Sequence, residues 1–224
     1  MNVPALPAPS EKQSGNVLFL ILFLIVAVSV GAYYVTRSEK NNSPNYDKKS
    51  ISVTSLLQYT QGIQKGVNRL LEKGVKWEHI DYHAPIDPEF TELAQSDKSA
   101  QLLFHPDGGG VTYYPVDRDA VEKVTRQVSR NQNGNWHFLK LRVKGIATSK
   151  KELALILYRV KPDVCAMINE ELHGSNTIPV ITSSAKNFFR GHTRLDGEGL
   201  TGKSAACFVT SDNRYLFYTV LLPR

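Results

Sequence analysis

Residues 136–146, WHFLKLRVKGI, show the clearest strand pattern in this chain of 224 residues. Over residues 139–144, three apolar side chains alternate with three basic ones. Successive side chains of a strand point to opposite faces of the sheet, so this alternation predicts a strand with one buried and one solvated face. The fold must therefore contain a sheet that another layer covers.

The C-terminal residues predict a hairpin. Residues 206–209 form its first strand, the polar residues 211–214 (SDNR) its turn, and residues 215–222 (YLFYTVLL) its second strand. The second strand is apolar on both faces, which is typical of a central, covered strand. We expect two further short strands at residues 102–105 and 111–114.

Two segments between these strands predict helices. Ser149 and Glu152 have the spacing of a capping box, so the residues that follow, ELALILYRV, are interpreted as a helix. Pro162 either kinks this helix or begins a second one. The continuation carries Cys165 and ends at Gly174.

Residues 50–73 predict an amphipathic helix that packs on its own domain or, alternatively, on a partner. Its apolar stripe consists of Leu56, Ile63, Val67 and Leu70. Gly74 ends the helix, and a second, short helix starts at Asp87-Pro88, with Asp87 as its N-cap and Pro88 at its first position. Gly62 and Gly66 permit close approach of a neighbouring element, although glycine also weakens a helix.

The N-terminal region contains an apolar segment of membrane length. Residues 16–36 carry no charge and read VLFLILFLIVAVSV from residue 17 onward. About 20 helical residues span the hydrocarbon core of a bilayer, so we expect a transmembrane helix here. The expected organisation is a short tail (1–15), the transmembrane helix (16–36), a polar linker (37–49) and a soluble α+β domain (50–224).

Two features of the sequence predict opposite orientations for this segment in the membrane. Lys12 precedes it, whereas Arg37 and Lys40 follow it, and this positive-inside count favours a cytoplasmic domain. A cysteine pair and the length of the domain favour the opposite side. We interpret the chain as a single-pass inner-membrane protein with a periplasmic domain. A secretory signal cleaved after Ala32 is the alternative.

Composition is that of a folded domain with a modest basic excess. Apolar residues make up 42% and charged residues 21%, and the net charge is +6. The basic residues are scattered, which fits contact with a lipid bilayer and argues against nucleic-acid binding. Cys165 and Cys207 predict one disulfide in an oxidising compartment, the alternative being two unrelated buried thiols.

The most distinctive local motif is FHPDGGG, which ends in the glycine loop, Asp107 to Gly110. Gly108, Gly109 and Gly110 can present backbone N–H groups to an anion, or they can form a tight turn. The motif lacks the lysine and the following helix of a phosphate-binding P-loop.

No catalytic or metal-binding constellation can be identified. His79 and His83 are four residues apart, but Pro85 favours a loop there, and no HExxH motif is present. No GxSxG motif is present either, and both cysteines are assigned to the disulfide. We therefore expect a protein that is not an enzyme and that needs neither a cofactor nor a metal.

Several segments together resemble a known family. They are Gly15 followed by NVLFLILFLIVAV, the helix SLLQYTQGIQKGVNRL, the motif FHPDGGGV, Cys165-x-x-Ile-Asn, and CFVTSDNRYLFYTVLLPR. With these segments the chain resembles small pilin- or pseudopilin-like single-pass membrane proteins of Gram-negative bacteria. The resemblance covers most of the chain, and its motifs are structural.

The resemblance implies an anchoring helix that can pack into a filament and a globular domain displayed outside the membrane. It implies processing after Gly15, with Asn16 as the new terminus, and other pilin-like subunits or envelope proteins as partners. Asn16 and Leu20 depart from the pattern, because pilins carry Phe and Glu there. The expected function is a non-enzymatic envelope protein acting through assembly or surface interaction. The alternative is an envelope module whose glycine loop holds an anionic ligand.

Overall fold

The structure is a computed structural model. It describes residues 21, 44–122, 136–146, 151–186 and 194–223. The chain divides into two units, residues 1–47 and 48–224. The candidate processing residues Gly15 and Asn16 and, apart from Ile21, the expected transmembrane helix at 16–36 lie outside the described residues. Within the described parts of the chain, no helix is long and apolar enough to cross a membrane.

Helix α2 spans Pro44–Glu72 and is the longest described element. It begins earlier than expected, so the prediction that residues 44–49 belong to a linker is wrong. Proline suits the first turn of a helix, where its missing N–H is not needed, and Asp47 there complements the helix dipole. The predicted apolar stripe is confirmed, because its four residues are buried. Gly74 follows the helix in a left-handed conformation, with φ +83°.

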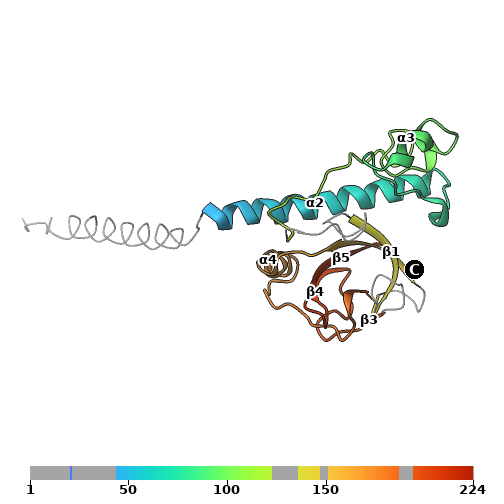
Figure 1. The fold of residues 1–224 in the computed structure, drawn as a ribbon. Helices are drawn as coiled ribbons and strands as arrows, with labels where there is room; N and C mark the ends of the chain where they lie inside the picture. Colours follow the sequence, from blue (N-terminus) through green and yellow to red (C-terminus); the bar gives the residue numbers. More distant parts are fainter. Residues whose placement is uncertain (1–20, 22–43, 123–135, 147–150, 187–193, 224) are drawn as a thin grey trace, which may run out of the picture. The chain divides into compact units, whose positions relative to one another are not determined.

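The domain has α+β architecture, with a five-stranded sheet in the order β3-β1-β2-β5-β4 (Figure 1). The strands are β1 (Trp136–Val143), β2 (Glu152–Tyr158), β3 (Arg194–Leu195), β4 (Ala205–Val209) and β5 (Tyr215–Leu222). Neighbouring strands are antiparallel except β1 and β3, which are parallel. The predicted strand at 136–146 and the predicted C-terminal hairpin are confirmed.

The prediction of a helix at residues 152–160 is wrong, because residues 152–158 form the central strand β2. This strand pairs with β1 on one side and β5 on the other. Leu153, Leu155 and Leu157 lie on one face of the sheet, and Ala154 and Ile156 lie on the other. All five side chains are at most 2% exposed. A continuous apolar run fits a strand covered on both faces, and tertiary packing overrides the helix propensity of Leu, Ala and Glu.

The strands predicted at residues 102–105 and 111–114 are absent. The first segment forms turns after the 3-10 helix η2 (Ser99–Gln101). The second has no regular secondary structure, and the backbone N–H of Val111 donates to the carbonyl of Leu103 at 3.2 Å. Only an isolated bridge joins Leu102 to Asp81. These residues wrap the C-terminal end of α2, where Leu103 and Phe104 pack against its apolar stripe.

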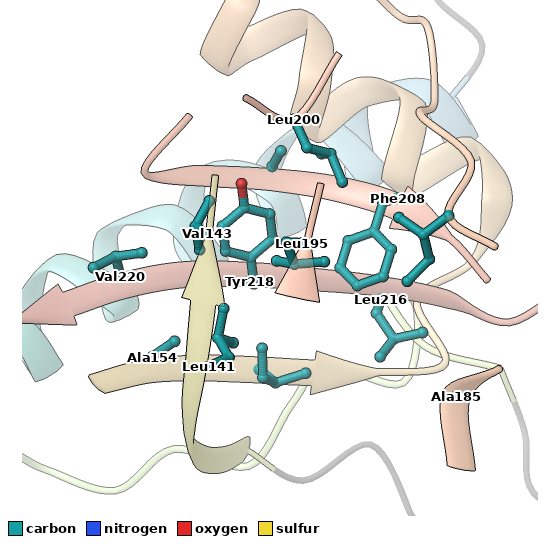
Figure 2. Packing of buried hydrophobic residues seen from close by; sticks show 13 residues of the cluster. Leu141, Val143, Ala154, Ala185, Leu195, Leu200, Phe208, Leu216, Tyr218 and Val220 are labelled. Atoms are coloured by element: carbon teal, nitrogen blue, oxygen red, sulfur yellow. The ribbon is translucent and has the colours of Figure 1, made fainter. Parts of the chain in front are cut away.

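Different segments of the chain pack on the two faces of the sheet. Helices α2 and α4 (Pro162–His173) bury one face. Pro162 begins α4, and Gly174 ends it in a left-handed conformation, as predicted. On the other face, Phe208 and Tyr218 pack with Leu195 and Leu200 from the chain before β4 (Figure 2). Two short helices, η1 (Trp77–His79) and α3 (Pro88–Ala94), lie in the connection from α2 to the sheet.

The two glycines inside α2 are expected to respond oppositely to alanine. Around Gly62 a Cβ would meet nothing within 4 Å, so Gly62→Ala should raise the free energy of unfolding by about 0.5–1 kcal/mol through helix propensity. At Gly66 a Cβ would lie 2.2 Å from Val111 Cγ2, so Gly66→Ala should lower the free energy of unfolding by about 1–3 kcal/mol. Each variant is the control for the other in denaturant unfolding. Equal effects would contradict the packing at Gly66.

Candidate binding sites

The backbone N–H groups of the glycine loop are paired within the chain. Gly108 and Gly110 donate to the carbonyl of His105 at 3.0 and 2.9 Å, and Gly109 donates to that of Leu102 at 3.0 Å. An anion held by this loop would have to replace these hydrogen bonds. The hydrogen bonding therefore favours the tight turn.

Steric constraints explain why the turn needs glycine. A Cβ at Gly108 would lie 2.0 Å from the carbonyl oxygen of Leu102, and Gly110 has φ +69°. Two basic side chains, one in the last turn of α2 and one just after the helix, hold the loop through carbonyl groups. Arg69 donates to Pro106 at 3.1 Å, and Lys73 donates to the carbonyls of Asp107 and Gly108 at 2.5 and 3.2 Å. The loop is therefore clamped to the end of α2 by charge-assisted hydrogen bonds.

A groove of about 830 Å³ runs along α2. One side of the helix, between Ile51 and Arg69, forms one wall. Residues 109–112 and 114–117 form the other, and Trp136 also lines the groove. The centroid of the Tyr59 ring lies 5.6 Å from that of Trp136 and 5.9 Å from that of Tyr114. Ile51 and Tyr114 are 67% and 60% exposed, so the groove presents apolar surface to solvent.

The ends of this groove have opposite charge. Lys65 and Arg69 line it beside the glycine loop, and Asp117 lines it at the other end. The backbone N–H of Asp119 and the hydroxyl of Ser52, which donate to Asp117 at 2.9 and 2.5 Å, hold the pKa of that carboxyl below its usual range. The groove is therefore a mixed surface.

A second cavity, the aromatic cleft, has a volume of about 460 Å³. Residues 80–87 form one side, and the first half of β1, with Phe104 and Tyr113, completes it. Tyr82 stacks on Phe138 with ring centroids 4.1 Å apart, and Phe104 meets Tyr113 edge-on at 5.4 Å. Trp136 lines both this cleft and the groove along α2.

Two carboxylates line the aromatic cleft. Asp81 Oδ1 accepts the backbone N–H of His83 at 2.9 Å and lies 2.6 Å from the ring Nδ1 of the same histidine. Asp87 was predicted to cap α3, but its Oδ2 accepts the backbone N–H of Ala84 at 2.7 Å instead, upstream of the helix. Both carboxylates are thus held by short local turns.

Burial and these carboxylates alter the titration of their neighbours. Burial, with a smaller contribution from Asp81, raises the pKa of Tyr82, and burial with Asp87 raises that of Tyr113. Burial lowers the pKa of His137 to about 4, so its ring is neutral at pH 7. Among the described residues that line the cleft, the Tyr82 hydroxyl and the Trp136 indole N–H are buried without a hydrogen-bond partner.

The structure contains the predicted disulfide between Cys165 of α4 and Cys207 of β4, with Cα atoms 5.3 Å apart. Sequence reasoning missed the neighbouring Asn169, which is 2% exposed. Its amide donates to the carbonyls of Thr177 and Cys207 at 2.9 and 2.8 Å and accepts the Cys207 N–H at 2.8 Å. The Asn169 side chain therefore satisfies both backbone groups of Cys207 at the outer edge of β4, as a neighbouring strand would.

No group of three or more potential metal ligands occurs among the residues that the structure describes. His79 ends η1, whereas His83 contacts Asp81. The aromatic cleft could not be predicted from sequence, because its residues are far apart in the chain. The only local signal was the density of aromatic and histidine residues at 77–83 and 136–138.

Comparison of the chain with protein-family models, curated proteins and solved structures finds no significant match.

Proposed function

We propose that this chain is a membrane-anchored, non-enzymatic, pilin-like envelope protein that acts through assembly or surface interaction. Its apolar N-terminal segment would hold it in the inner membrane, and its α+β domain would be displayed in the periplasm. The glycine loop has no part in this proposal, because its N–H groups are paired.

The observation that carries the proposal is the sequence of the N-terminal segment. Residues 16–36 carry no charged side chain, and residues 17–30 are apolar except for Ser29. Ile21, the one described residue of the segment, is helical and 56% exposed. An uncharged, apolar run of this length is most stable in a bilayer or against other apolar helices.

Two further features support the placement and the pilin-like role. A buried disulfide is typical of proteins that fold in an oxidising compartment, which favours the periplasm over the cytoplasm. A long helix, α2, follows the apolar segment in the chain, and its later part packs on the antiparallel strands β2 and β5 of the mixed sheet. This order of elements agrees with the resemblance to pilin-like proteins.

Replacing residues 18–28 with a polar segment of equal length is expected to abolish membrane association. The segment supplies most of the apolar residues that favour transfer from water to hydrocarbon. Fractionation of cell membranes with the full chain, followed by carbonate extraction, measures the effect. Ile51→Asn, which removes an exposed apolar side chain of α2 outside the segment, is the control and should remain membrane-bound.

Two results would contradict the proposal. One is recovery of the wild-type chain in the soluble fraction. The other is a mature protein that starts at Tyr33, which would mean cleavage after Ala32 and secretion without the anchor. The N-terminal residue and mass of the membrane-bound protein test this directly. A start at Asn16 supports pilin-type processing, whereas an intact Met1 supports the anchor and contradicts that processing.

A further inference from the structure

We propose that the aromatic cleft binds a small organic cation that carries a quaternary ammonium group, for which choline is a suitable probe. This inference goes beyond the proposed function, since neither membrane anchoring nor assembly requires it.

The charge of the cleft is the first argument. The chain has six more basic than acidic side chains, yet the described side chains that line the cleft include two carboxylates and no lysine or arginine. Among the described residues, hydrogen bonds engage only Oδ1 of Asp81 and only Oδ2 of Asp87. In each carboxylate the other oxygen accepts no hydrogen bond from a described residue.

The aromatic rings are the second argument. Tyr82, Phe104, Tyr113, Trp136 and Phe138 all line the cleft. Ring faces carry negative electrostatic potential and attract cations, most strongly where water is excluded. Rings combined with carboxylates favour a weakly hydrated organic cation over a metal ion, which prefers more oxygen ligands than the two carboxylates supply. The neutral ring of His137 adds no opposing charge at pH 7.

The cleft is also preformed. Asp81 is held by backbone hydrogen bonds on both sides, from its N–H to Gln101 at 3.0 Å and from Leu103 to its carbonyl at 2.9 Å. The opposite wall belongs to β1, which pairs along residues 136–141 with the buried strand β2. A rigid site loses little conformational entropy when it binds a ligand. Its volume of about 460 Å³ is within the range of small-molecule pockets.

The groove along α2 is less suited to the same ligand. Lys65 and Arg69 line it and would repel a cation, and only Asp117 has the opposite charge. The aromatic cleft is thus lined by rings and carboxylates without a lysine or arginine, and the histidines that line it are His83 and His137. Two ligands of equal shape and different charge can test this difference.

The experiment is a calorimetric titration of the full-length chain, in a neutral detergent, with two ligands. One is choline, and the other is its uncharged isostere, the alcohol in which a tert-butyl group replaces the trimethylammonium group. Choline should bind saturably and at least about tenfold more tightly than the isostere, because only choline gains from the carboxylates and ring faces. The wild-type protein alone decides this comparison.

Variants locate the site. The double variant Asp81→Asn/Asp87→Asn removes both charges but keeps an oxygen that can accept the local backbone N–H groups, so it should fold and bind choline at least about tenfold more weakly. Asp212→Asn is the matched control. It removes one charge from a carboxylate that accepts the Ala185 N–H at 2.8 Å outside the cleft, and it should bind as the wild type does.

Three outcomes would overturn the inference. They are the absence of saturable choline binding to the wild type, equal affinity for choline and the isostere, and unchanged choline affinity in a folded double variant. The second outcome would show a merely apolar pocket, and the third would place the site elsewhere. Circular dichroism and thermal unfolding establish whether the double variant is folded.

Discussion

Replacing both Cys165 and Cys207 with alanine is expected to lower the free energy of unfolding by about 4 kcal/mol, because the disulfide closes a loop of about forty residues. Closing such a loop removes conformations from the unfolded chain. Both cysteines are fully buried against α2 and β5, so lost packing adds to the effect. Guanidinium unfolding of the full chain in a neutral detergent, followed by circular dichroism, measures the difference.

Reduction supplies the internal control for this prediction. A reductant should destabilise the wild type by a similar amount once unfolding exposes the disulfide, and it should leave the double-alanine variant unchanged. A variant within about 1 kcal/mol of the oxidised wild type would contradict the assigned role of the bond. If the alanine variant is sensitive to reductant, the reductant acts through another group.

Elements with a one-sided apolar pattern could be predicted from sequence. The α2 stripe and the alternation in β1 each encode one face to bury and one to leave in water, and the polar turn at residues 211–214 marks the C-terminal hairpin. β2 carries no such contrast, because both of its faces are covered. A short apolar run of Leu, Ile and Ala fits a central strand as well as a buried helix. Only its partners β1 and β5 decide between them.

The candidate sites were less predictable, for a related reason. That Gly108 can offer an N–H group is a local property, but its acceptor, the carbonyl of His105, is set by how the chain folds back. In the aromatic cleft, Tyr82 meets Phe138 across more than fifty residues of sequence. Asn169 looked like an ordinary helix residue until its partners on β4 were known. Local patterns predict which groups are present, whereas tertiary structure decides which of them meet.

Asn169→Asp is expected to lower the free energy of unfolding by about 3–5 kcal/mol, although it changes the shape of the side chain very little. Aspartate can still accept the N–H of Cys207, but it has no N–H to donate to the carbonyls of Thr177 and Cys207. A carboxylate oxygen would then face two carbonyl oxygens at a position that is 2% exposed. Asn213→Asp, in the exposed turn before β5, is the control and should change stability by at most about 0.5 kcal/mol.

The pH dependence of the stability of Asn169→Asp shows whether the loss comes from a buried carboxylate or from altered packing. Burial would raise the pKa of the new carboxyl above its value in the unfolded chain, so the folded variant would bind a proton more readily than the unfolded one. Stability relative to wild type should therefore recover as the pH falls through the raised pKa, since the protonated acid regains one donor for a carbonyl. Urea unfolding between pH 7 and pH 4 measures this recovery. A deficit that stays constant over that range would contradict the buried-carboxylate explanation and would mean that the packing around β4 had changed instead.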